Sequence, residues 1–118
     1  MTRPSYRELD RKLSTAKMCI FDSTFKFENP TQFVIDAAEL GFTLSSGDLL
    51  TILREIKPEH YAGEKPPERS YKSNIRNCEL FTFVWQSSYL DQVVYLKFAI
   101  KNDTVWFISL HQPRHNRS

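Results

Sequence analysis

The chain is poor in the residues that build disulfide scaffolds, metal clusters and membrane spans. It has two cysteines, Cys19 and Cys78, and three glycines among 118 residues. Two cysteines do not make a disulfide framework, and neither lies in a CxxC or Cys/His spacing typical of a metal site. No apolar signal core or bilayer-length apolar run is present. We therefore expect a cytoplasmic protein with reduced thiols and no membrane contact.

Charge of one sign is also scarce. The 16 Lys and Arg against 14 Asp and Glu give a net charge of +2, so whole-chain electrostatics does not by itself indicate nucleic acid. The two halves differ, because residues 1–60 carry eight basic against nine acidic side chains and residues 61–118 carry eight against five. The basic excess in the second half weakly favours an anionic ligand, although a merely solvated face explains it about as well.

Apolar residues are plentiful, at 41% with 14% aromatics. A chain of this length fits one domain, residues 1–118, and buries about two thirds of its unfolded surface. Helical spacing predicts a helix from Pro4 through Leu13, a second over 31–40 and a third over 48–57. The apolar segment 18–27 fits either a strand or a linker.

Capping residues mark the ends of these helices. Asn29 or Thr31 is suited to cap the second helix, and Gly41 follows it where a left-handed residue is favoured. Pro58 ends the third helix. Three segments rich in β-branched and aromatic residues then predict strands over 79–86, 93–100 and 104–111. The expected fold class is α+β, with the N-terminal helices packed on one face of an antiparallel sheet of at least three strands.

Alternation sorts the side chains of these strands into two faces. In the middle strand the side chains expected to face the helices are Val94, Leu96, Phe98 and Ile100. Those expected on the opposite face are Val93, Tyr95, Lys97 and Ala99. In the first strand, the side chains expected to face inward are Phe81, Phe83 and Trp85, and those expected outward are Thr82 and Gln86.

The turn before the last strand decides where His111 lies. A two-residue turn pairs Val94 with His111 and buries the histidine, whereas a three-residue turn pairs Tyr95 with His111 and Lys97 with Ser109. The second register also directs three apolar side chains to the core: Trp106, Ile108 and Leu110. Since each large buried side chain contributes about 1.5–3 kcal/mol, burial favours the three-residue turn.

A polar group then shares the outer face of the sheet: Gln86, Tyr95, Lys97, Ser109 and His111. Cleavage of RNA through its own 2′-hydroxyl needs an acid, a base and positive charge at the phosphate. His111 can serve as acid or base, Lys97 can hold the phosphate, and Tyr95 and Gln86 can position it. This chemistry needs no metal ion and no cofactor. Polar residues are, however, ordinary on a solvated strand face.

The long polar loop over 60–77 mixes cations with tyrosines, a composition suited to gripping phosphates and stacking unpaired bases. Its candidate RNA-binding residues are Tyr61, Lys65, Arg69, Tyr71 and Lys72. Arg114 in the C-terminal tail extends the basic group. His60 is a candidate second proton-transfer residue, on condition that the loop folds over the sheet.

Five short pieces occur in an order that resembles one known family. They are AAELG at 37–41, EHY at 59–61, WQ at 85–86, VYLK at 94–97 and SLH at 109–111. Together they make the chain similar to the motility quorum-sensing regulator (MqsR) toxins, over about residues 5–112. The resemblance implies a RelE-like fold and a metal-independent, mRNA-cleaving toxin that a cognate antitoxin protein neutralises.

The same resemblance implies roles for individual residues. Gln86 and Tyr95 match the catalytic glutamine and tyrosine of the family. Two positions depart from it, since Ala62 and His111 stand where lysines are usual, and Lys65 is the nearest substitute for the first. Two other function classes remain open: a non-catalytic RNA- or ribosome-binding module, and a protein-interaction domain that uses an exposed edge strand.

Overall fold

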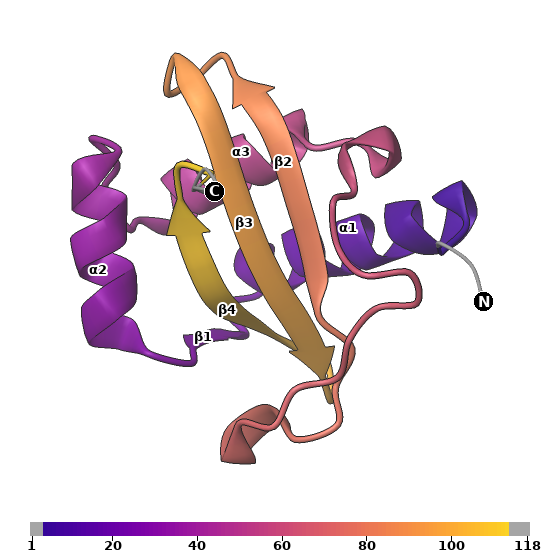
Figure 1. Ribbon diagram of the computed structural model, residues 1–118. Coiled ribbons are helices and arrows are strands. Elements are labelled where there is room, and N and C mark those ends of the chain that lie inside the picture. Colours follow the sequence, from indigo (N-terminus) through magenta and orange to yellow (C-terminus); the bar gives the residue numbers. More distant parts are fainter. Residues whose placement is uncertain (1–3, 114–118) are drawn as a thin grey trace, which may run out of the picture.

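The computed structural model describes residues 4–113, which form an α+β fold with helices in the N-terminal half and most of the sheet in the C-terminal half (Figure 1). The helices are α1 (Tyr6–Phe21), α2 (Pro30–Glu39) and α3 (Ser46–Glu55). The strands are β1 (Phe25–Phe27), β2 (Phe81–Ser87), β3 (Gln92–Lys101) and β4 (Thr104–His111). Two short 3₁₀ turns, η1 (Pro58–His60) and η2 (Ser73–Ile75), lie in the connection between α3 and β2.

Helix α1 is longer than the sequence pattern predicts. Its N-cap is Ser5, whose hydroxyl oxygen accepts a hydrogen bond from the Glu8 amide at 3.1 Å, as expected of a serine at this position. The helix continues to Phe21 because Cys19 and Ile20 extend its buried stripe. The segment 18–27 is therefore neither one strand nor one linker: it ends a helix and then contributes the three-residue strand β1.

Helices α2 and α3 have the caps that their sequences favour. The Asn29 side chain accepts from the Gln32 amide at 3.2 Å, and Ser45 accepts from the Asp48 amide at 3.1 Å. Gly41 follows α2 at a φ of 76°, a left-handed conformation that glycine adopts without a Cβ penalty. Helix α3 ends at Glu55, three residues before Pro58.

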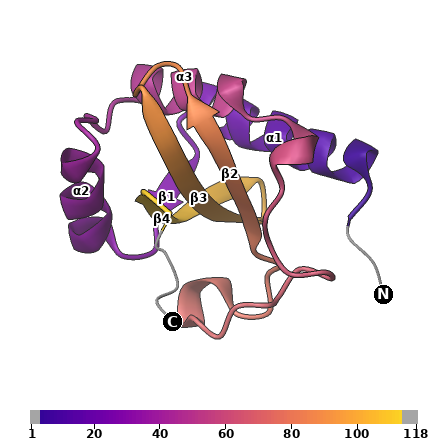
Figure 2. The ribbon, with the colours of Figure 1, turned by 45° about the horizontal axis from the view of Figure 1, so that its top comes forward.

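The four strands form one mixed sheet in the order β1-β4-β3-β2. Strand β1 runs parallel to β4, and the other neighbours are antiparallel. The helices cover one face, as Figures 1 and 2 show. Side chains from all three helices join the inner face of the sheet in one core, as predicted for Phe81, Phe83 and Trp85.

The turn between β3 and β4 has two residues, not the three that hydrophobic burial favoured. Lys101 pairs with Thr104, and the intervening Asn102 and Asp103 have φ values of 50° and 61°. Positive φ at both central residues is typical of the turn whose twist matches that of a β-hairpin. The prediction of a three-residue turn is therefore wrong.

A β-bulge nevertheless restores the predicted pairing of the candidate site residues in β3 and β4. Phe98 pairs with Phe107, but the next residue back, Lys97, pairs with Ser109, which leaves Ile108 as an extra residue in β4. Such a bulge shifts the register by one residue. Near the turn, Val105 and Phe107 thus face the core instead of Trp106 and Ile108, which was not expected. Beyond the bulge, Leu110 is buried as predicted.

The outer face of the sheet is only partly open. The segment 68–80 folds over the part of this face that lies near the β3–β4 turn. Backbone hydrogen bonds close this segment on itself, including Leu80 N to Glu68 O at 2.9 Å and Ser70 N to Cys78 O at 3.0 Å. Ile75 and Leu80 form a second apolar cluster there with Ala99. The partly buried side chains of this cluster are Cys78, Trp106 and Ile108.

This second cluster changes the expected burial of Ala99 and Thr82 and the expected place of Trp106. Ala99 and Thr82 do lie on the outer side, but both are buried. Trp85 belongs to the main core as predicted, whereas Trp106 packs in the second cluster.

Cys19 and Cys78 lie in different clusters and are both free thiols. Within residues 4–113, no helix has the length and apolar character that crossing a bilayer requires.

Candidate active site on the outer face

Tyr95 and His111 meet face to face on the open part of the sheet. They are direct cross-strand partners in β3 and β4. Their rings stack with centroids 4.6 Å apart and an angle of 10° between the planes. Cross-strand partners on one face have Cβ atoms about 4.5–5.5 Å apart, so this register holds the two rings in contact. The expected proximity of the tyrosine and the histidine is confirmed.

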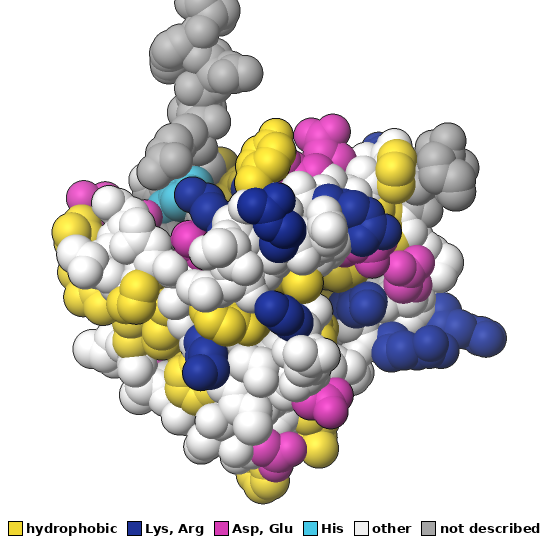
Figure 3. Space-filling model, turned by 90° about the horizontal axis from the view of Figure 1, so that it is seen from below, with side chains coloured by type: hydrophobic (Ala, Val, Ile, Leu, Met, Phe, Trp, Pro, Cys, Tyr) yellow, Lys and Arg dark blue, Asp and Glu magenta, His cyan; other side chains and the backbone are white. Residues whose placement is uncertain are grey.

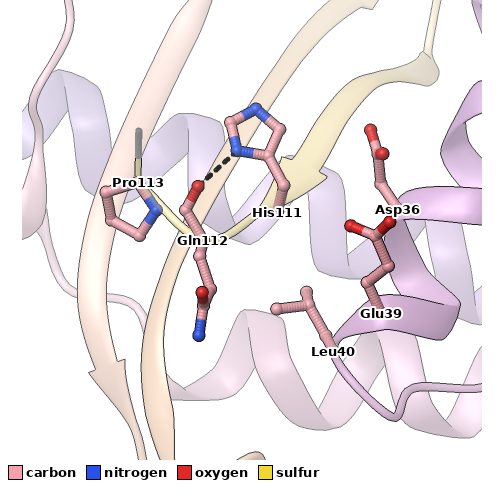
Figure 4. A pocket seen from close by; sticks show the side chains of 6 residues that line it. All are labelled: Asp36, Glu39, Leu40, His111, Gln112 and Pro113. Atoms are coloured by element: carbon pink, nitrogen blue, oxygen red, sulfur yellow. Dashed lines mark hydrogen bonds between the residues drawn. The ribbon is translucent and has the colours of Figure 1, made fainter. Parts of the chain in front are cut away.

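The His111 imidazole is held in one orientation by the backbone that follows it. Its Nδ1 lies 2.6 Å from the carbonyl oxygen of Gln112 (Figure 4). A carbonyl oxygen only accepts hydrogen bonds, so the bond requires a proton on Nδ1. In the neutral ring Nε2 is then the proton acceptor, on the opposite side of the ring. This tautomer suits a residue that takes up or returns a proton.

Lys97 and Gln86 lie on the same face as this pair. Lys97 is two residues along β3 from Tyr95, which corresponds to about 7 Å of strand, and it pairs with Ser109 on one side and Thr82 on the other. Gln86 pairs with Val93, diagonally from Tyr95, and is exposed. The structure therefore brings together four of the predicted site residues: Gln86, Tyr95, Lys97 and His111.

A hollow of about 240 Å³ opens beside His111, between α2 and the end of β4 (Figure 4). We call it the His111 hollow; it is lined by Asp36, Glu39, Leu40, His111, Gln112 and Pro113. The carboxylates of Asp36 and Glu39 lie on the α2 side, across from the imidazole. Asp36 is only 8% exposed, and its Oδ1 accepts a hydrogen bond from the side-chain Nε2 of Gln32 at 2.9 Å.

Sequence reasoning missed these two carboxylates. Asp36 and Glu39 occupy the last turn of α2, where no basic residue is present. The C-terminal end of a helix carries partial negative charge, so an acidic side chain there is unfavourable by about 0.3–1 kcal/mol. An acidic last turn is the one signal in the sequence that could have drawn attention to them.

A second, smaller hollow lies beside Lys97 under the folded segment 68–80. It measures about 160 Å³, and we call it the loop hollow. Its lining contains Glu68, Arg69, Ser70, Tyr71, Lys72, Leu80, Lys97 and Ile108. Three predicted RNA-binding residues thus meet a predicted catalytic one. Figure 3 views the end of the molecule that carries this segment and the β3–β4 turn, and Lys and Arg side chains gather on it.

The other predicted site residues lie elsewhere. The bridge between Tyr61 and Phe83 places His60 beyond the outer edge of β2, so β2 and β3 separate it from β4, three strand spacings or about 14 Å. Its Nδ1 accepts from the Lys57 amide at 2.9 Å. A role beside His111 would require His60 to lie over the outer face of the sheet. The loop that begins at His60 does not place it there.

Tyr61 and Lys65 also lie outside the group. Tyr61 is 6% exposed and packs its ring against Phe83 in the main core, which leaves no ring face for an RNA base, contrary to expectation. Lys65 is exposed in the connection between α3 and β2 but lines neither hollow. Arg114 lies outside the described residues.

Metal ligands do not converge in the part of the chain that the structure describes. Asp36, Glu39 and His111 line one hollow, but within residues 4–113 no three or more His, Cys, Asp or Glu side chains are grouped so that they could hold a metal ion.

The helix side of the sheet carries a separate hydrogen-bond network centred on Glu55. Its carboxylate accepts from Trp85 Nε1 at 3.0 Å, from the Ser87 hydroxyl at 2.6 Å and from the Tyr89 amide at 2.9 Å. Burial disfavours ionisation of this carboxyl, but these hydrogen bonds outweigh it and lower the Glu55 pKa. The network ties α3 to β2 and thereby fixes the frame that carries the outer face.

Asp48 adds a second tie between the same elements. It accepts hydrogen bonds from Thr43, Tyr89 and Ser45, which together lower the pKa of its carboxyl. The Tyr89 hydroxyl donates to Asp48 at 2.6 Å, and this bond raises the tyrosine pKa. Both ties hold the β2–β3 connection to the start and end of α3.

Comparison with models of known protein families finds no match, and comparison with curated proteins finds none either.

Proposed function

We propose that the protein is a metal-independent endoribonuclease that cleaves mRNA through the 2′-hydroxyl of the substrate. The observation that carries the proposal is the stacked Tyr95–His111 pair, with the imidazole tautomer fixed by Gln112 and Lys97 one step along the same face. An acid–base group, a phenol and a cation on one open surface are the groups that this reaction uses.

In the proposed reaction the 2′-oxygen attacks phosphorus and the bond from phosphorus to the 5′-oxygen breaks. The 2′-hydroxyl loses a proton and the leaving oxygen gains one, so the products are a 2′,3′-cyclic phosphate and a 5′-hydroxyl. His111 Nε2 takes the proton from the 2′-hydroxyl and then returns it to the leaving 5′-oxygen, so the imidazole ends the reaction in its starting state. Lys97 offsets the charge of the phosphorane, and Tyr95 and Gln86 hold the phosphate by hydrogen bonds.

We further propose that the protein acts in the cytoplasm as the toxin of a type II toxin–antitoxin pair related to the MqsR family, on a RelE-like fold. The support is the set of short sequence pieces together with the placement of Gln86 and Tyr95 on one face of the sheet. The partners implied are RNA and a cognate antitoxin protein. His111, in place of the usual lysine, assigns the proton transfer to an imidazole.

The test is incubation of purified protein with single-stranded RNA in EDTA. The wild type is compared with a double variant, Tyr95→Phe with His111→Ala, and with the control His60→Ala. We expect the wild type and the control to cleave, with cyclic phosphate ends, and the double variant to leave RNA intact. Intact RNA in the wild-type reaction, or equal cleavage by the double variant, would refute the proposal.

The second candidate function is an RNA-binding module without catalysis, favoured by the loop hollow with its three cations. It predicts RNA affinity that falls steeply with salt and no cleavage. A docking role for the β2 edge has less support, since the edge is partly occupied by the Tyr61–Phe83 bridge and by the bond from Ala62 N to Thr82 O at 2.8 Å.

A further inference from the structure

We propose that the loop hollow is a nucleotide subsite, separate from the cleavage centre, that holds one phosphate and one unpaired base of the same RNA strand. The inference rests on the proposed function for the identity of the ligand. What is added is a second position on the substrate, and with it a requirement for single-stranded RNA longer than a dinucleotide.

The cations of the hollow supply the phosphate site. Arg69, Lys72 and Lys97 line it, and Glu68 is the one carboxylate that opposes them. Arg69 Nη1 donates to the Asn77 carbonyl at 2.7 Å, which orients the guanidinium while it uses one of five N–H donors. Three cations against one anion around about 160 Å³ favour an anionic group.

The position of the backbone around these cations is fixed. The Lys72 amide donates to the Ser70 hydroxyl oxygen at 3.0 Å, and Ser70 is buried. The fully buried Ile75 anchors the segment to the outer face of the sheet. Lys101 Nζ adds a bond to the Asn74 carbonyl at 2.8 Å. A subsite built on an anchored segment loses little entropy on binding.

Tyr71 supplies the place for a base. It is 83% exposed, the highest value among the large hydrophobic side chains that are exposed, although it adjoins an apolar floor formed by Leu80 and Ile108. At this exposure the ring is accessible to a ligand in the hollow. Stacking of an unpaired base on an aromatic ring contributes about 1–3 kcal/mol.

Lys97 belongs to both places. It lines the loop hollow and also follows Tyr95 along the outer face of β3. About 7 Å of strand separates the two residues, a distance comparable with the span of one nucleotide. A strand whose scissile phosphate lies at Tyr95 and Lys97 therefore reaches the loop hollow with a neighbouring nucleotide. Base-paired RNA keeps its bases stacked within the duplex and cannot offer one to Tyr71.

The experiment measures binding independently of cleavage. A fluorescent single-stranded oligoribonucleotide with 2′-O-methyl groups lacks the attacking hydroxyl, so it binds without being cut. Its affinity is measured by anisotropy at several salt concentrations for the wild type, Tyr71→Ala, Tyr71→Phe and Lys72→Ala. The matched controls are Phe21→Ala, an aromatic residue 76% exposed on α1, and Lys57→Ala, an exposed lysine before η1.

We expect Tyr71→Ala to weaken binding about tenfold and Tyr71→Phe to restore it, because stacking needs only the ring. Lys72→Ala should weaken binding and reduce the salt slope by about one. Both controls should bind like the wild type. Circular dichroism checks that each variant is folded.

The outcomes separate this inference from the proposed function. Binding that depends on Tyr71 and Lys72, by a protein that leaves ordinary RNA intact, supports the subsite and refutes the nuclease. If the wild type cleaves RNA, and Tyr71→Ala matches it both in affinity for the probe and in KM for cleavage, the subsite is overturned and the nuclease proposal stands. Wild-type affinity equal for the single strand and its duplex also overturns the subsite.

Discussion

Two hollows lie beside Tyr95 and Lys97 on the outer face, the His111 hollow and the loop hollow, and they differ in charge. The His111 hollow has two carboxylates, Asp36 and Glu39, on its α2 side, whereas the loop hollow has three cations and one carboxylate. A phosphodiester is repelled at the first and attracted at the second. On the proposed function, we therefore expect the RNA backbone to run from Tyr95 and Lys97 toward the loop hollow, and the His111 hollow to receive a neutral part of the substrate or none.

The two hollows also differ in what fixes them. The His111 hollow lies between a helix and the end of a strand, elements that belong to the main core. The loop hollow depends on the smaller cluster around Ile75. Our proposal thus places the chemistry beside the main core and the second binding position beside the smaller cluster.

The largest expected effect tests whether chemistry belongs to the His111 side. His111→Ala should lower kcat for RNA cleavage by about 10²–10⁴-fold, the usual contribution of a general acid or base, with little change in KM. His60→Ala, whose imidazole lies beyond the β2 edge, should keep near wild-type kcat. Steady-state kinetics with a defined single-stranded RNA measures both. A comparable fall in kcat for both variants would contradict the assignment.

An intermediate effect tests whether one frame supports both hollows. Glu55→Gln should lower the free energy of unfolding at pH 7 by about 1–2 kcal/mol, because charged hydrogen bonds to Ser87 and Tyr89 are weakened. The Glu55 pKa lies below its ordinary value of 4.5, so its contribution is fully present above pH 4.5 and is lost as the pH falls through the lowered pKa. Urea unfolding as a function of pH measures the difference between variant and wild type.

The control for this variant is Glu59→Gln, at an exposed position in η1, which should leave stability unchanged. RNA affinity of folded Glu55→Gln at pH 7 should match that of the wild type. A difference in unfolding free energy that persists undiminished at pH 3 would show that the charge of Glu55 is not its cause.

The smallest effect has the opposite sign to those at the loop hollow. Glu39→Gln removes a carboxylate beside His111 and should tighten binding of the 2′-O-methyl oligoribonucleotide about twofold at low salt, since an exposed charge is strongly screened. Lys72→Ala should weaken binding of the same probe. Anisotropy titrations at two salt concentrations measure both. Weaker binding by Glu39→Gln would mean that the carboxylate contacts the RNA directly.

Much of the frame follows from local sequence signals. Helical spacing and caps such as Asn29 and Gly41 place α2 and α3 within about two residues, and β-branched runs place β2 to β4. Strict alternation along β3 sorts Val94, Leu96 and Phe98 to the core. These features depend on neighbouring residues only, which is why a single sequence predicts them.

The remainder depends on contacts between distant segments. The bulge at Ile108 arises because the Asn102–Asp103 turn and the burial of Leu110 demand registers that differ by one residue. The parallel strand β1 and the folded segment 68–80 are held by pairing with residues far along the chain. Asp36 reaches the site only because α2 packs beside β4, which no local pattern in the helix indicates.

The extra residue in β4, Ile108, sets the pairing register of every residue that follows it in the strand. If Ile108 were paired with Lys97 instead of being left out of the ladder, the hairpin would continue in the register set by its turn, and His111 would come opposite Val94 on the core side of the sheet. One unpaired residue in β4 therefore decides whether the histidine at the end of the strand lies beside Tyr95 on the outer face or among the side chains of the core.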